Sequence, residues 1–388
     1  MYNNRLHEKI VCGDPRDIQQ ANVPSTSTDP RVPSFRTRSA NPAVYPDAQC
    51  DIPCPGNPKF QCGAGNKLTW YAYTGTTAKP ALYKWNYPTG VNAGQYSLLI
   101  GGRTVPLITT QGINGKVAFV EKGGTGLGNG TGAYELDLTQ INNFDAAWRT
   151  QDKYATDVFC AGGLTLPDRK GRVVTVGGWA GQDLLGVRIW TPDGSAGVKG
   201  TAQWQEDAMN IQMQRPRWYP SAMTMANGSL LIIGGEIGNN DAAEPTIELF
   251  PPTGKPVYLE FLDRTWPDNL YPFICVIPAG IFVAYFNEAR ILDARTFATI
   301  KTLPNMPGSV TETNSGRTYS LEGTMVLLPQ YAPYTTPLGV LICGGSTSGN
   351  ANGLAIDNCI STQPEAANPT WLVERMVYLS LPSTRQKR

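Results

Sequence analysis

Short runs of β-branched and other apolar residues, most of them ending in small residues, recur along the chain. They are GKVAFVEKGG (115–124), GRVVTVGG (171–178), GSLLIIGG (228–235), GIFVAYFN (280–287) and LGVLICGG (338–345). A second apolar stretch with a polar turn precedes four of them, in LTLPDRKG (164–171), AMTMANG (222–228), CVIPAG (275–280) and MVLLPQYAP (325–333). Apolar runs bounded by such turns predict strands that pair as hairpins. No stretch keeps an apolar period of 3.6 residues for long, so we expect little helix.

The spacing of these runs predicts repeated units. Counted from Gly123 to Gly177, Gly234 and Gly344, the steps are 54, 57 and 110 residues, and a degenerate copy at Ala284 lies near the middle of the last step. A unit of four strands in roughly 50 residues, closed by Gly-Gly, is typical of a kelch-type β-propeller. Glycines suit the places where blades converge, because a Cβ atom would clash there. We therefore predict an all-β, kelch-type propeller with about five visible blades; a β-sandwich with coincidental spacing is the alternative.

Composition adds limits to this picture. The 388 residues favour one large domain and a small one, and the formal net charge of +1 gives no reason to expect a nucleic acid or an acidic membrane as partner. No apolar run approaches the roughly 18 residues of a membrane span. The first residues, MYNNRLHEKIVCGD, lack the pattern of a secretory signal.

A cysteine cluster marks the N-terminal part of the chain. Four of the eight cysteines lie within the first 62 residues: Cys12, Cys50, Cys54 and Cys62. Such clustering predicts a small disulfide-stapled module of an oxidising compartment, with three possible pairings of the four cysteines. A zinc site is the alternative, although the spacing is irregular and His7 would be a poor fourth ligand. TGTTAKP (74–80) is typical of a linker.

Two motifs carry the candidate chemistry, DVFCAGG (157–163) and RPRWYPSAM (215–223). Each stands at the start of a repeat, and equivalent positions in adjacent blades are neighbours in space. Cys160 and Tyr219 are therefore expected to meet. Taken singly, Cys160 would be a small buried hydrophobe and Tyr219 a core aromatic residue.

Long stretches of the sequence resemble a known family. They are WNYPTGVNAGQY (85–96), TVPLITTQGINGKVAFVEKGGTG (104–126), GAYELDLTQI (132–141), TDVFCAGGLTLPD (156–168), RPRWYPSAM (215–223), NEARILDARTF (287–297) and LGVLICGGS (338–346). Across residues 80–376 the chain resembles the fungal glyoxal oxidase branch of the copper radical oxidases, relatives of galactose oxidase. The resemblance implies that Cys160 is joined by a thioether to the ring of Tyr219, and that Tyr219 is also a copper ligand.

The implied chemistry explains why such a pair is needed. Oxidation of an aldehyde or alcohol removes two electrons, whereas a copper ion that moves between Cu(II) and Cu(I) accepts one. In the family the radical of the modified tyrosine accepts the second electron, and O2 then takes both electrons and leaves as H2O2. The resemblance thus implies a secreted, copper-dependent oxidase with a small aldehyde or alcohol substrate.

The chain also departs from this family. A copper site of the family uses two histidines and an axial tyrosine, but the single histidine here is His7, and no Tyr-His pair occurs. The family closes seven blades and adds a β-sandwich, whereas five repeats are visible within 85–376 and the tail 377–388 matches nothing before it. We therefore expect a truncated, catalytically incomplete member. A five-bladed ring with an altered metal site is the rival interpretation.

The N-terminal cysteines carry a second resemblance. CDIPCPGNPKFQCGAGNKLTWY (50–71) resembles the closing half of a WSC domain, a module associated with cell-wall glycans. We expect a partial WSC module over 1–73 and a linker over 74–84. Trp70, Tyr71 and Tyr73 would stack on sugar rings or pack against the linker. A non-catalytic fragment with weak glycan binding is the alternative function.

Three cysteines remain in the repeats. Cys343 and Cys359 flank a loop of the fifth repeat and are candidates for a disulfide. Cys275 lies inside an apolar strand and is expected to be a buried free thiol.

Overall fold

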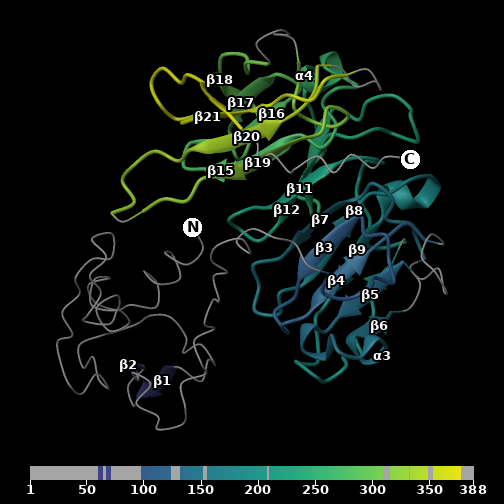
Figure 1. Cartoon of the computed structure of the whole chain (residues 1–388). Helices are drawn as coiled ribbons and strands as arrows, with labels where there is room; N and C mark the ends of the chain where they lie inside the picture. The colour runs from purple at the N-terminus through teal and green to yellow at the C-terminus, as the bar shows by residue number, and fades with distance from the viewer. Residues whose placement is uncertain are drawn as a thin grey trace, which may run out of the picture. The chain divides into compact units, whose positions relative to one another are not determined.

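Five antiparallel sheets of four strands follow one another in the described part of the chain (Figure 1). The computed structural model describes residues 60–63, 67–70, 98–123, 132–151, 155–207, 209–308, 315–331, 333–347 and 353–376. Of the predicted site residues, His7, Cys12, Cys50, Cys54, Tyr71 and Tyr73 lie outside this set, as does the tail 377–388.

The chain divides into two units, Met1–Ser97 with Tyr331–Thr335, and Leu98–Gln330 with Thr336–Arg388. In the first unit, β1 (Phe60–Gly63) pairs with β2 (Lys67–Trp70), which sets Cys62 opposite Leu68 along the backbone. The second unit holds the five sheets.

Each sheet is one blade, and its strands run in chain order. Blade 1 is β3 (Ile108–Gln111), β4 (Val117–Val120), β5 (Ala133–Leu136) and β6 (Trp148–Thr150). Blade 2 is β7 (Gly162–Thr165), β8 (Val173–Val176), β9 (Val187–Trp190) and β10 (Gln205–Glu206). Blade 3 is β11 (Ser221–Thr224), β12 (Leu230–Ile233), β13 (Thr246–Phe250) and β14 (Val257–Tyr258). Blade 4 is β15 (Phe273–Ile277), β16 (Gly280–Tyr285), β17 (Glu288–Leu292) and β18 (Thr299–Thr302). Blade 5 is β19 (Gly323–Leu327), β20 (Val340–Gly344), β21 (Asn358–Thr362) and β22 (Leu372–Arg375).

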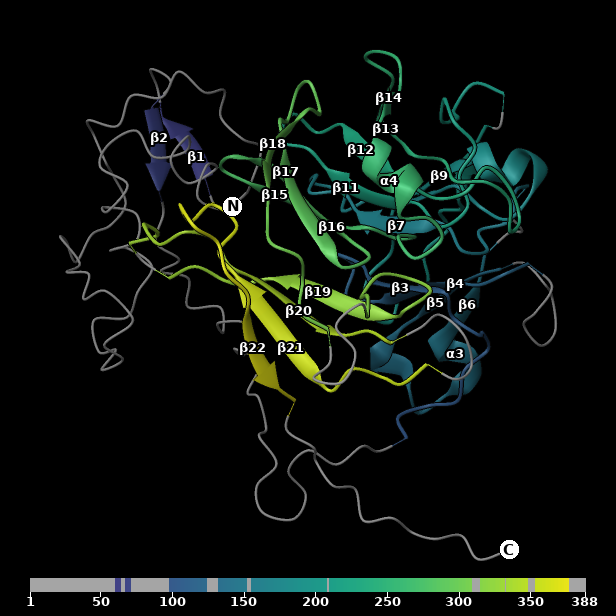
Figure 2. The ribbon, with the colours of Figure 1, turned by 90° about the horizontal axis from the view of Figure 1, so that it is seen from above.

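The blades stand around a common centre, as Figure 2 shows from above. Their first strands are neighbours in the order β3, β7, β11, β15 and β19. The predicted hairpins are confirmed, because each apolar stretch with a polar turn forms the first strand of a blade and the following run forms the second. The predicted all-β propeller is therefore correct.

Apolar side chains between successive blades form the core. The second strands of blades 2, 3 and 4, which are β8, β12 and β16, are buried at every position, whereas β4 and β20 are partly buried. One face of each of these strands packs on the preceding blade and the other on the next. Ile281 and Val283 meet blade 3, for example, while Phe282 and Ala284 meet blade 5. This two-sided burial explains why the runs are continuously apolar rather than alternating.

The repeat count taken from Gly123 is wrong by two residues. β4 ends at Val120 and β8 at Val176, so Glu121 holds the position of Gly177. The N–H of Glu121 donates to Gly132 O (2.9 Å), just as the N–H of Gly177 donates to Gly186 O (2.9 Å). The Gly-Gly pair of 123–124 lies beyond the blade position, and blade 1 begins its turn with a buried glutamate.

Close backbone contacts explain the Gly-Gly pairs of blades 3 and 5. Gly235 has a φ of 99°, and a Cβ atom there would lie 2.4 Å from Trp218 O. Gly345 has a φ of 107°, and its Cβ would lie 2.3 Å from Gly316 O. These glycines let the loop before each blade pass next to the end of its second strand.

Buried arginines fasten the same turns. Arg188, Arg217 and Arg317 are fully buried, and each donates Nη1 to the carbonyl of a first glycine: Gly177 (2.8 Å), Gly234 (2.8 Å) and Gly344 (2.7 Å). Arg217 also pairs with Glu248 at 2.9 Å, and both side chains are fully buried. Paired, hydrogen-bonded charges of this kind resist separation, because a single partner would remain as an uncompensated buried ion.

In the described residues the helices are short, as expected. They are η2 (Leu138–Gln140), α3 (Phe144–Ala147), η3 (Gly181–Leu185) and α4 (Glu260–Arg264). Within the described residues, no helix has the length and apolar character needed to cross a membrane.

Candidate functional site at one end of the propeller axis

The loops that precede β7 and β11 bring Cys160 and Tyr219 together. The N–H of Tyr219 donates to Cys160 O at 3.1 Å, although 59 positions separate the two residues in the sequence. Both side chains belong to one cluster, in which Tyr219 is buried and Cys160 is partly buried. Cys160 and Tyr219, which stand at the starts of adjacent blades, therefore lie in contact in the folded chain, as we expected.

Three consecutive carbonyls in the loop before blade 2 accept hydrogen bonds from residues in the loops before blades 3 and 4. The indole N–H of Trp218 donates to Phe159 O at 3.1 Å, and the hydroxyl of Tyr271 donates to Ala161 O at 3.3 Å. The N–H of Tyr219 takes the carbonyl between them. Segment 159–161 is thus held by blades 3 and 4 together.

The same backbone conformation recurs in three blades. Cys160, Tyr219 and Tyr271 have φ values of 58°, 60° and 49°, each two residues before the first strand of its blade. This left-handed region is unfavourable for side chains with a Cβ atom, and such residues persist where the surroundings impose it. The backbone hydrogen bond between Tyr219 and Cys160 is repeated one blade further on, where the N–H of Tyr271 donates to Tyr219 O at 3.1 Å.

Aromatic rings enclose Tyr219. Its centroid lies 4.1 Å from that of Trp218 and 4.7 Å from that of Tyr319, which is stacked at an interplanar angle of 26°. Tyr271 meets it edge-on at 5.5 Å. The phenol is therefore surrounded by groups that are themselves oxidisable.

Burial sets the protonation of this cluster. Desolvation raises the pKa of Tyr219 well above its ordinary value, and hydrogen bonding to Tyr319 raises that pKa further. Desolvation also raises the pKa of the Cys160 thiol, partly offset by hydrogen bonds from Tyr219 and Trp218. The phenol and the thiol are both neutral at pH 7 in this arrangement.

A cation stands beside the aromatic cluster. The Nζ atom of Lys122, which lies between β4 and β5 of blade 1, is 3.4 Å from the centroid of Trp179 and 4.5 Å from that of Phe159. The ring centroid of Phe159 in turn lies 6.2 Å from that of Trp218. The positive charge of Lys122 therefore acts near Cys160 from a third blade.

The described residues do not fit a copper ion by themselves. Cu(II) prefers a tetragonal set of nitrogen and oxygen ligands. Around Tyr219 the cluster offers phenols and one thiol, and no imidazole, since the chain's one histidine is His7. Among the described ranges there is also no group of three His, Cys, Asp or Glu residues arranged to hold a metal.

The cysteines of the propeller have two different states. Cys343 and Cys359 form a disulfide across β20 and β21. Cys275 is a buried free thiol, which confirms the expectation, and burial raises its pKa to about 12.

Two tyrosines of the cluster were not predicted from the sequence. Tyr271-Pro272 repeats the Tyr219-Pro220 pair, and Arg317-Thr318-Tyr319 repeats the order of Arg217-Trp218-Tyr219. These internal echoes were available in the sequence. They would have identified Tyr271 and Tyr319 as residues of the same end of the axis.

The described fold and site define a class: a kelch-type β-propeller with a cysteine and tyrosines gathered where its blades begin. Residues 144–383 match the family model described as "Glyoxal oxidase N-terminus". The chain belongs to this family.

Two curated relatives are similar to the chain. A "WSC domain-containing protein" of Arthroderma benhamiae is 55% identical over 370 residues, which cover 95% of this chain and 37% of that protein. An "Aldehyde oxidase GLOX" of Vitis pseudoreticulata is 28% identical over 236 residues, which cover 58% of this chain and 41% of that protein. The chain thus spans about two fifths of the length of these relatives.

One solved structure is similar over a large part of the chain. It is a fungal alcohol oxidase of the AA5 family in complex with copper, with a TM-score of 0.49 and 16% sequence identity. The match covers 73% of this chain and 56% of that one.

Proposed function

We propose that, by family, the chain is a glyoxal oxidase-like copper radical oxidase, and that Cys160 and Tyr219 are the residue pair from which the radical cofactor of that family is made. The observation that carries this proposal is their juxtaposition, with the N–H of Tyr219 on Cys160 O and both side chains in one aromatic cluster. Copper would supply one-electron chemistry, and the substrates would be a small aldehyde or alcohol and O2, with H2O2 as a product.

The 388 residues by themselves are proposed to be inactive. With His7 as their single histidine, they cannot provide two imidazoles, and the described cluster offers copper only phenols and a thiol. Cu(II) held by such a set would be weakly bound. In this state the chain's residues hold Tyr219 as a neutral, hydrogen-bonded phenol inside the protein.

A second candidate function belongs to the N-terminal part. The relative that is 55% identical carries a WSC-domain name. On this basis residues 1–73 would bind cell-wall glycan weakly and bring the propeller to polysaccharide outside the cell. Their pairing of Cys12, Cys50, Cys54 and Cys62 in disulfides belongs to the same proposal.

Two assays on one preparation of the purified chain separate these functions. We expect no H2O2 above background from copper-loaded protein given methylglyoxal or a simple alcohol, and the matched variants Tyr219→Phe and Cys160→Ser should give the same background. Peroxide formation that disappears in Tyr219→Phe would contradict the proposed inactivity.

Retention on insoluble chitin or β-glucan measures glycan binding independently, when the chain is compared with a variant chain that begins at residue 98. Equal retention of the two would exclude a role of the N-terminal part.

A further inference from the structure

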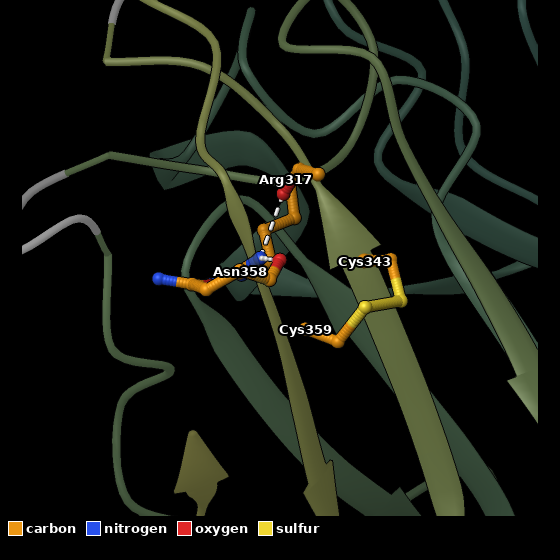
Figure 3. The surroundings of a disulfide bond; sticks show 5 residues. Arg317, Cys343, Asn358 and Cys359 are labelled. Atoms are coloured by element: carbon orange, nitrogen blue, oxygen red, sulfur yellow. Dashed lines mark hydrogen bonds between the residues drawn. A yellow bond between two sulfur atoms is a disulfide. The ribbon is translucent and has the colours of Figure 1, made fainter. Parts of the chain in front are cut away.

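The Cys343–Cys359 disulfide joins two residues that lie directly opposite each other on β20 and β21 (Figure 3). The other four blades have cross-strand pairs at the same position: Val120 with Ala133, Val176 with Val187, Ile233 with Ile247, and Ala284 with Ala289. All eight of these aliphatic residues are buried, whereas Cys343 and Cys359 are partly exposed. A small reductant can therefore reach this bond, unlike a group at the same place in the other blades.

The disulfide joins the two strands that carry two acceptors of a buried arginine, Gly344 O and the Asn358 side-chain oxygen; a third acceptor, Pro307 O at 2.7 Å, lies outside these strands. Arg317 donates Nη1 to Gly344 O at 2.7 Å, and Gly344 follows Cys343 in the chain. Arg317 also donates Nη2 to the Asn358 side-chain oxygen at 2.7 Å, and Asn358 precedes Cys359. Figure 3 shows Arg317 and Asn358 beside the disulfide. The covalent bond thus fixes the spacing between the strands that hold the guanidinium group.

Arg317 depends on this spacing more than its counterpart in blade 3. Arg217 is paired with Glu248, but Ile360 holds the sheet position of Glu248 in blade 5. Among the described residues no carboxylate pairs with Arg317, and its Nε has no hydrogen-bond partner. Burial lowers the pKa of Arg317 to about 10. A buried cation with only neutral oxygen acceptors is stabilised by hydrogen bonds to them. Small shifts of the strands that carry these oxygens therefore weaken the stabilisation of the cation.

Arg317 in turn fixes the segment that carries Tyr319. The N–H of Arg317 donates to Phe286 O at 2.9 Å, and Arg317 O accepts the N–H of Gly323 at 2.7 Å. Two residues after Arg317, the ring of Tyr319 stacks on Tyr219. A continuous set of contacts therefore leads from the disulfide to the candidate site.

We propose that the Cys343–Cys359 disulfide is a redox-sensitive lock on segment 315–323, which holds Tyr319 against Tyr219 while the bond is intact. A dithiol reductant opens the lock: it transfers two electrons and two protons to the bond, two cysteine thiols form, and the reductant becomes its cyclic disulfide. H2O2 closes the lock again, because it takes the two electrons and two protons from the thiols and leaves as two molecules of water.

Hydrogen exchange with and without dithiothreitol tests the lock on the full chain. Peptides of 315–323 report on the protected amides of Arg317 and Gly323, and peptides of 215–221 report on the equivalent segment of blade 3. We expect reduction to speed exchange in 315–323 about tenfold or more while 215–221 is unchanged, and H2O2 to restore the original rate. Alkylation with iodoacetamide, mapped by mass spectrometry, verifies that Cys343 and Cys359 have been reduced.

The matched control is Cys343→Val/Cys359→Val, which installs the aliphatic pair of blade 2. In this variant dithiothreitol should leave exchange in 315–323 unchanged, which excludes an effect of the other cysteines. The proposal would be overturned if reduction of the wild-type protein, verified by alkylation of both cysteines, left the rate of exchange in 315–323 unaltered. The comparison of oxidised and reduced wild-type protein tests the proposal even if the double variant does not fold.

Discussion

Replacement of Arg217 by methionine is expected to destabilise the chain by about 3–5 kcal/mol, because it leaves Glu248 as an unpaired buried charge. The pair is 2.9 Å apart with both side chains fully buried, and Arg217 also holds Gly234 O and Thr246 O. Unfolding by guanidinium chloride, followed by tryptophan fluorescence at pH 7, gives the change in stability from the shift of the midpoint.

Two further variants test whether the loss of stability comes from the buried charge that is left unpaired. Arg375→Met removes an arginine whose side chain is 78% exposed and pairs with Asp357, and it should cost less than about 1 kcal/mol. Arg217→Met/Glu248→Met removes both buried charges and should be more stable than Arg217→Met alone. If Arg217→Met were as mild as Arg375→Met, the buried pair would not fasten the blade as described.

The second large effect is expected for Gly235→Ala, next to the candidate site. At a φ of 99° the new Cβ would lie 2.4 Å from Trp218 O, and that carbonyl accepts the N–H of Glu236 at 2.7 Å. The clash must push away the loop that carries Tyr219. We expect a loss of at least about 2 kcal/mol beyond the backbone strain alone.

Gly228→Ala isolates the strain component. Gly228 has a φ of 88°, and nothing lies within 4 Å of its ideal Cβ position, so this variant should lose only about 1–2 kcal/mol. The comparison uses midpoints of chemical unfolding for both variants. Equal losses would mean that the close contact between Gly235 and Trp218 does not constrain the loop.

The fold was predictable because its signal is repeated. Continuous β-branched runs with polar turns predict buried hairpins, and the period of about 55 residues predicts blades. The count failed in blade 1 because Gly123-Gly124 looks like the pair of Gly177-Gly178, whereas the hydrogen bonds place Glu121 at that position. A local motif cannot reveal where its strand ends, since pairing with the next strand decides this.

The site was predictable in part. Equivalent positions at the starts of adjacent blades meet, so the approach of Cys160 and Tyr219 follows from the repeat. The stacking of Tyr319 on Tyr219 does not follow from it, because Tyr319 comes from a loop of blade 5 whose path depends on the buried Arg317. That arginine is held by carbonyl groups, and the identities of the residues do not specify such contacts.

The most direct test of the central claim is peptide mapping of Cys160 and Tyr219 after the purified chain has been kept with Cu(II) in air. The account predicts that the peptides of Cys160 and Tyr219 are recovered separately, with Cys160 fully alkylated, because the described cluster around Tyr219 offers copper only phenols and a thiol. A single linked species, two hydrogens lighter than the sum of the two peptides, would contradict this result and show that the chain completes its own cofactor.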